Sequence, residues 1–147
     1  RAGLPLSDYE DALRALAEEL RLSVRFIPFC PQRELAGHLR DSDVVCVPSV
    51  WQEPFGMAVL EAMACGAPVV ASNTTALPEG TGDAALLAPP DPPEAIAAQL
   101  ACVLENPAVQ VELRDRGLRR VKGFSWERAA RMTLDVYCHA AAARKIA

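Results

Sequence analysis

The chain has 147 residues, a formal net charge of −4 and 51% apolar residues. A domain of this length buries about two thirds of the surface of its unfolded chain, so we expect one domain with a substantial core. The mild negative charge and the scattered basic residues argue against a nucleic-acid partner. No apolar run approaches the ~20 residues of a membrane span, and no export signal opens the chain. We therefore expect a cytoplasmic protein.

The first part of the chain predicts two helices and one strand. Apolar side chains recur at helical spacing over residues 6–22. The run Val24-Arg25-Phe26-Ile27 has the β-branched and aromatic composition of a strand, and Pro28 ends it. Residues 32–40 predict a second, shorter helix.

The middle of the chain predicts a buried strand followed by a helix. Residues 43–47 form a short, almost continuously apolar run that Pro48 closes, as in strands buried on both faces of a sheet. A helix is expected over residues 55–65. It stops at Gly66, which can close a helix C-terminus, and at Pro68, which cannot continue one.

The last part of the chain also predicts strands followed by helices. Two further strands are expected over residues 69–72 and 84–88, and three helices over residues 94–104, 108–121 and 125–143, the last with Ser125 as its N-cap. Strands that alternate with helices predict the α/β class, with a Rossmann-like parallel sheet flanked by helices.

The residue types that bind metals are not clustered. The five cysteines contain no C-x-x-C pair, and His38 and His139 lie far apart. We expect neither a metal site nor a disulfide framework.

The connection from Pro48 to Glu61 is the candidate site. It links a buried strand to a helix, and ligands of open α/β sheets bind outside the carboxyl ends of the strands. Glu53 and Glu61 lie eight residues apart, which is up to ~12 Å if the connection is mostly helical.

Between these glutamates, the backbone N–H groups of Phe55, Gly56, Met57 and Ala58 are expected at the start of a helix. Such groups lack intrahelical partners and bind phosphate without side-chain charge. Gly56 would let a diphosphate approach the backbone. Glu61 could accept hydrogen bonds from a ribose diol, and Glu53 from sugar hydroxyls. Taken alone, however, two glutamates near a helix start are better explained as ordinary residues whose negative charge the helix dipole favours.

The surrounding pattern favours the functional interpretation. Residues 48–72 read P-S-x-x-x-E-P-F-G-x-x-x-L-E-A-M-A-C-G-x-P-V-V-A-S. This pattern resembles the signature of the retaining glycosyltransferases of the GT-B fold, in family 4 (glycosyl transferases group 1). Residues 24–29, the Leu77-Pro78-Glu79 turn and the Phe124-Ser125-Trp126 helix start extend the resemblance, which covers essentially the whole chain.

The resemblance implies a role for each site residue. Glu53 would lie beside the donor sugar at the reaction centre, and Glu61 would hold the ribose. The amides of residues 55–58 would bind the diphosphate, and the main chain near Phe29 and Cys30 would border the base. The donor would be a UDP- or GDP-linked sugar, used without a metal or a cofactor.

The resemblance also implies that residues 1–147 are part of a C-terminal nucleotide-sugar-binding domain, ending in a helix over about 125–143. The domain's first two strands and the N-terminal acceptor domain would be absent, so the chain, which begins at Arg1, looks like a fragment. An upstream segment or a partner chain would supply the acceptor site and any peripheral membrane association.

The implied activity is the transfer of a hexose from a nucleoside diphosphate sugar to an unknown acceptor, with retention of configuration. Two alternatives stay open: a non-catalytic sugar-nucleotide-binding subunit of a two-chain enzyme, and a GT-B epimerase. The E-P-F-G helix start and the Phe124-Ser125-Trp126 segment favour the transferase over the epimerase.

Overall fold

The computed structural model describes residues 6–144. These residues divide into an N-terminal unit that ends at Pro31 and a C-terminal unit that begins at Gln32. In the N-terminal unit, α1 spans Leu6–Glu19. It ends three residues before the predicted limit because Arg21 adopts φ 53° and the N–H groups of Arg21 and Leu22 donate to the carbonyls of Glu18 and Ala17. This hydrogen-bond pattern closes helix C-termini.

The predicted strand over residues 24–27 is wrong, because the structure has no strand there. Val24 and Ile27 are half exposed. A strand requires partners for its N–H and C=O groups, and no neighbouring strand pairs with this run in the described part of the chain. The segment instead contacts α1, because the guanidinium of Arg14 lies 4.2 Å from the ring centroid of Phe26.

The C-terminal unit is built on a parallel sheet, as predicted. The strands β1 (Val45–Val47), β2 (Val69–Ser72) and β3 (Leu86–Ala88) lie in the order β1-β2-β3. Cys46 pairs with Val70, and Ala71 pairs with Leu87. In the described residues, the other edge of β1 pairs with no strand.

Helices cover both faces of this sheet, so the predicted α/β class is confirmed. One face packs against α3 (Met57–Ala64), with α2 (Gln32–Arg40) beside it. The other face packs against α5 (Pro93–Glu105) and α6 (Pro107–Arg120).

The side chains of β2 alternate between the two halves of the core. Val69 and Ala71 are fully buried in the half that contains Val59 and Met63 of α3, whereas Val70 belongs to the half formed with α5 and α6. This alternation follows from the two-residue period of a strand. Both faces of β2 are therefore covered by buried side chains.

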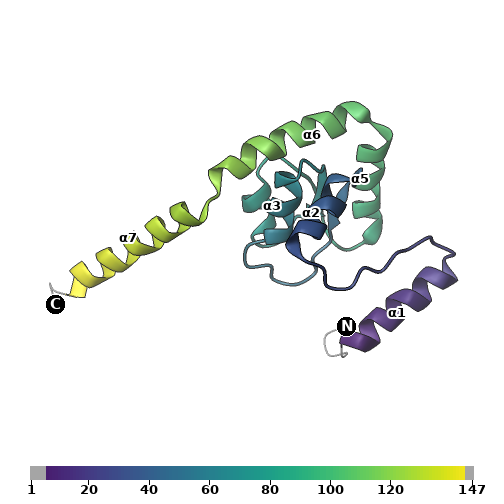
Figure 1. Ribbon diagram of the computed structural model, residues 1–147, viewed down its shortest axis with the longest axis horizontal. Coiled ribbons are helices and arrows are strands. Elements are labelled where there is room, and N and C mark those ends of the chain that lie inside the picture. The colour runs from purple at the N-terminus through teal and green to yellow at the C-terminus, as the bar shows by residue number, and fades with distance from the viewer. Residues whose placement is uncertain (1–5, 145–147) are drawn as a thin grey trace. The chain divides into compact units, whose positions relative to one another are not determined.

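Three helical segments complete the unit. The short helix α4 (Leu77–Thr81) was not predicted, and η1 (Val121–Gly123) connects α6 to α7 (Trp126–Arg144). Ser125 caps α7 as predicted, because its Oγ accepts a hydrogen bond from the Arg128 N–H at 3.1 Å. Every side chain described from residue 125 to 143 is exposed, and Figure 1 shows α7 projecting from the helices around the sheet. In the part of the chain that the structure describes, no helix has the length and apolarity needed to cross a membrane.

Candidate functional site

The candidate site lies at the carboxyl edge of the sheet, where the loops after β1 and β2 meet. The first loop covers residues 48–56 and leads into α3, and the second covers residues 73–76 and leads into α4. In the second loop, the Asn73 N–H donates to the Ala88 carbonyl at the end of β3, at 2.9 Å. The ends of β2 and β3 are thereby connected at the edge where open α/β sheets bind ligands.

Helix α3 begins at Met57, two residues later than predicted. Gly56 is its N-cap, with φ 84° and ψ 47° in the left-handed region. Phe55 therefore precedes the helix, and only Met57 and Ala58 of the four predicted amide donors lie in its first turn. At the other end, Gly66 with φ 79° closes the helix as predicted.

Two separate constraints require glycine at position 56. A left-handed φ is unfavourable for residues that carry a Cβ. A Cβ built on Gly56 would also lie 2.6 Å from Cδ2 of Leu77, a residue that is 1% exposed. The close approach of α4 to the N-terminus of α3 thus depends on the missing side chain.

The N-terminus of α3 has no side-chain cap. Gly56 cannot provide one, and its carbonyl accepts a hydrogen bond from the Val59 N–H at 3.1 Å. The amides of Met57 and Ala58, which precede Val59 in the first turn, lack intrahelical acceptors, and the helix dipole gives this end a partial positive charge. Met57 and Ala58 are exposed. The arrangement suits an anionic ligand that supplies the missing acceptors.

Glu53 lies on the loop before α3, and its side chain is oriented by neighbours on the same loop. Its Oε2 accepts a hydrogen bond from the indole Nε1 of Trp51 at 3.1 Å and lies 3.5 Å from Oγ of the buried Ser49. The sequence analysis did not predict this hydrogen bond from Trp51. The other carboxylate oxygen is a potential acceptor for a ligand hydroxyl.

The backbone of Glu53 is fixed by the loop after β2. Its N–H donates to Oγ1 of Thr75 at 3.0 Å, and its carbonyl accepts from the Ala76 N–H at 3.4 Å. Thr75 has φ 51°, a left-handed conformation that is uncommon for a β-branched residue. The neighbouring hydroxyls of Ser72 and Thr74 are buried without a protein partner.

Glu61 occupies the second turn of α3. It is half-buried, and its Oε1 accepts a hydrogen bond from Nε2 of Gln32, the first residue of α2, at 3.4 Å. Met57 lies four residues earlier, so both side chains lie on one face of the helix. The carboxylate of Glu61 is therefore one helical turn from the uncapped amides.

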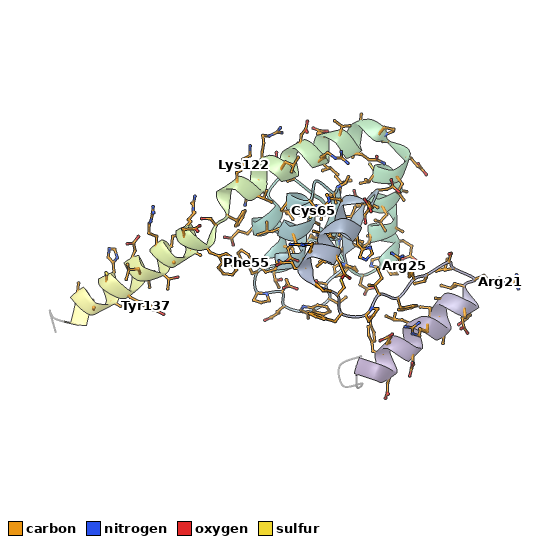
Figure 2. The ribbon with its side chains drawn as sticks, viewed as in Figure 1. Arg21, Arg25, Phe55, Cys65, Lys122 and Tyr137 are labelled. Atoms are coloured by element: carbon orange, nitrogen blue, oxygen red, sulfur yellow. The ribbon has the colours of Figure 1, made fainter. Side chains whose placement is uncertain are left out.

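Phe55 forms one side of a hollow of about 210 Å³ beside the loop. Its ring packs edge-to-face against Phe124, with centroids 6.1 Å apart (Figure 2 labels Phe55). The Arg120 guanidinium lies 5.1 Å from the Phe124 ring centroid and donates to the carbonyls of Glu79 and Gly80. The predicted Pro-Glu turn is thus the start of α4, and Arg120 connects α4 to the end of α6.

Phe29 and Cys30 lie in the N-terminal unit. Phe29 is 99% exposed, and Cys30 is half-buried. Their assignment to the nucleotide base stays a prediction.

Potential metal ligands are not gathered at the site. In the described residues, no three His, Cys, Asp or Glu side chains form a cluster that could hold an ion. A D-x-D spacing occurs at Asp41-Ser42-Asp43, but it precedes β1 and so lies at the amino edge of the sheet. A hollow of about 320 Å³ at that edge is lined by both aspartates, Arg40 and Arg114. It is larger than the hollow beside Phe55 but lies opposite the edge where α/β sheets bind ligands.

A parallel α/β unit with an uncapped helix N-terminus at the carboxyl edge of its sheet has the arrangement of the Rossmann-like nucleotide-binding domains. The chain belongs to the family described as Glycosyl transferases group 1, whose sequence model matches residues 2–120. The predicted family is therefore confirmed.

Two relatives illustrate the similarity in sequence. The D-inositol 3-phosphate glycosyltransferase of Kineococcus radiotolerans is 40% identical over 141 residues, which cover 88% of this chain and 32% of that protein. The O-antigen chain mannosyltransferase B of Escherichia coli is 38% identical over 114 residues, which cover 78% of this chain and 30% of that protein. The chain thus spans about a third of the length of these relatives.

Solved structures agree with this assignment. Sucrose-phosphate synthase from Thermosynechococcus elongatus superposes with a TM-score of 0.81 at 33% identity, covering 92% of this chain and 35% of that one. HepE from Anabaena, solved in complex with UDP-glucose, gives a TM-score of 0.73 at 25% identity, covering 82% of this chain and 34% of that one. The fold is that of the C-terminal domain of GT-B glycosyltransferases, as predicted. The two relatives are named as glycosyltransferases and the protein from Thermosynechococcus elongatus as a synthase, and none of these three is named as an epimerase.

Proposed function

We propose that this chain is the donor-binding part of a retaining glycosyltransferase that moves a hexose from a nucleoside diphosphate sugar to an acceptor. One observation carries the proposal: the uncapped N-terminus of α3 lies between Glu53, which is anchored before it, and Glu61, one turn beyond Met57. Membership of the glycosyltransferase family supports the class of reaction.

The diphosphate binds the backbone amides of residues 55–58. Met57 and Ala58 donate from the first turn of α3, and Phe55 and Gly56 from the approach to it. Negative charge that develops on the leaving diphosphate is stabilised by N–H donors already fixed by the fold. Electrostatic stabilisation of this kind is the largest contribution to the rate acceleration of many enzymes. In this proposal neither a metal nor a cofactor takes part.

Glu53 orients the donor sugar, and Glu61 accepts hydrogen bonds from the ribose diol. The base lies near the main chain of Phe29 and Cys30, and the donor is UDP- or GDP-linked. The HepE structure with UDP-glucose supports a sugar nucleotide as the ligand of this fold. Glu53 forms no covalent bond in this scheme. The bond between the sugar's anomeric carbon and the phosphate oxygen breaks, the acceptor oxygen bonds to the same face, and its proton passes to the leaving phosphate.

The acceptor site belongs to the part of the enzyme that this chain does not span. The named relatives, which are glycosyltransferases, do not favour the alternative of a non-catalytic donor-binding subunit.

The test is the stereochemistry of transfer. An active polypeptide that contains this sequence is supplied with UDP-glucose or GDP-mannose and an acceptor, and the anomeric configuration of the first product is read by proton NMR. We expect an α-linked product from these α-linked donors. A β-linked product would contradict retention.

A further inference from the structure

We propose that Thr75 is a positioning residue for Glu53, acting through its side-chain hydroxyl. The inference rests on the proposed contact of Glu53 with the donor sugar. Thr75 lies 22 residues after Glu53, on the loop that follows β2. The Glu53 N–H donates to Thr75 Oγ1 at 3.0 Å, and the next residue, Ala76, donates its N–H to the Glu53 carbonyl at 3.4 Å. The peptide groups on both sides of the Glu53 Cα are thus held by consecutive residues.

The backbone conformation of Thr75 indicates that its hydroxyl has a role beyond shaping the turn. At φ 51° it occupies a region that favours glycine and is unusual for a β-branched side chain. Such outliers persist where the surroundings determine them, and they cluster at functional sites. A glycine would fit the turn more easily but could not accept the Glu53 N–H.

The loop that carries Thr75 is itself fixed to the core. The Asn73 N–H donates to the Ala88 carbonyl at the end of β3, and the Leu77 N–H donates to the Thr74 carbonyl at 3.2 Å. Leu77 is buried and fills the space next to Gly56. Thr75 therefore holds the backbone of Glu53 in a fixed position relative to the sheet. No ligand contact is assigned to Thr75.

The first experiment measures the hydrogen bond itself. Amide hydrogen exchange of Glu53 is followed by NMR in an active polypeptide that contains this sequence and in its Thr75→Val, Thr75→Gly and Thr75→Ser variants. We expect exchange about tenfold faster in the valine and glycine variants, and within about twofold of the unsubstituted rate in the serine variant. Thr74→Val is the matched control, because it removes a hydroxyl that has no protein partner. Unchanged exchange in both Thr75→Val and Thr75→Gly would overturn the inference.

The second experiment measures the consequence for the sugar. The dissociation constants of UDP and UDP-glucose, and of GDP and GDP-mannose, are compared by calorimetry in the same variants. For the pair that binds, we expect Thr75→Val and Thr75→Gly to lower the sugar's contribution to affinity about fivefold, the effect of one hydrogen bond. Affinity for the bare nucleotide should stay unchanged, and Thr75→Ser should restore the sugar's contribution.

Glu53→Gln separates the two ways in which this can fail. If Glu53→Gln leaves the sugar's contribution unchanged, the proposed role of Glu53 is wrong, and the inference fails with it. If Glu53→Gln removes that contribution and Thr75→Gly does not alter it, only the inference about Thr75 is overturned.

Discussion

Replacing Gly56 with alanine adds one methyl group at the N-terminus of α3. The new Cβ would lie 2.6 Å from Cδ2 of Leu77, which is buried in the core and cannot move into solvent. The left-handed conformation costs a residue with a Cβ about 1–2 kcal/mol, and overpacking costs a further 1–3 kcal/mol, roughly. We expect Gly56→Ala to lower the free energy of unfolding by about 2–5 kcal/mol, which for a chain of this size lowers Tm by about 10 °C.

Urea unfolding followed by circular dichroism measures this change, and Gly37→Ala is the matched control. Gly37 lies inside α2, and a Cβ there would meet nothing within 4 Å. Alanine at position 37 should therefore stabilise the chain by up to about 1 kcal/mol through helix propensity. If Gly56→Ala unfolds within about 0.5 kcal/mol of the unsubstituted chain, the steric argument for glycine at the start of α3 is wrong.

Three further predictions concern the site and its supports. In the active enzyme, Glu61→Ala should raise the KM for the donor about tenfold or more, because hydrogen bonds to the ribose are lost. Glu53→Ala should instead lower kcat by about a hundredfold. An unchanged KM in Glu61→Ala would show that Glu61 does not bind the ribose. Turnover should survive a strong chelator, because fixed amides at the start of α3 meet the diphosphate charge; activity that EDTA abolishes and Mg²⁺ or Mn²⁺ restores would refute this. Arg120→Gln should lower Tm by about 3–10 °C, because it removes bonds to two carbonyls of α4 and the contact with a phenyl ring. The exposed Arg119→Gln is its control, and equal Tm values would show that Arg120 does not hold α4.

The sequence predicted the parts of this fold that depend on local pattern. Apolar runs at residues 43–47 and 69–72 became β1 and β2, and Gly66 closed α3 as expected. The strand at residues 24–27 failed because β-branched composition does not provide a partner for its backbone. Helix α4 was missed because it has only five residues and includes Pro78 and Gly80, both poor helix formers.

The candidate site was predicted in outline but not in its supports. Spacing and family resemblance indicated Glu53, Gly56 and Glu61, and the structure places all three along the approach to α3 and its first two turns. Thr75 carried no signal in the sequence, because its role depends on a positive φ and on a hydrogen bond to a residue 22 positions earlier. The contact of Phe55 with Phe124 likewise exists only through tertiary packing.

The most direct test of the account is a ¹H–¹⁵N NMR titration of an active polypeptide that contains this sequence with UDP-glucose and with GDP-mannose. We expect one of the two to shift the amide resonances of Gly56, Met57 and Ala58 most strongly, with saturation, and the shifts at the start of α3 to persist with the bare nucleoside diphosphate. Shifts that cluster instead at Arg40 and Arg114, around the hollow at the amino edge of the sheet, would contradict the account, as would the absence of shifts with either donor.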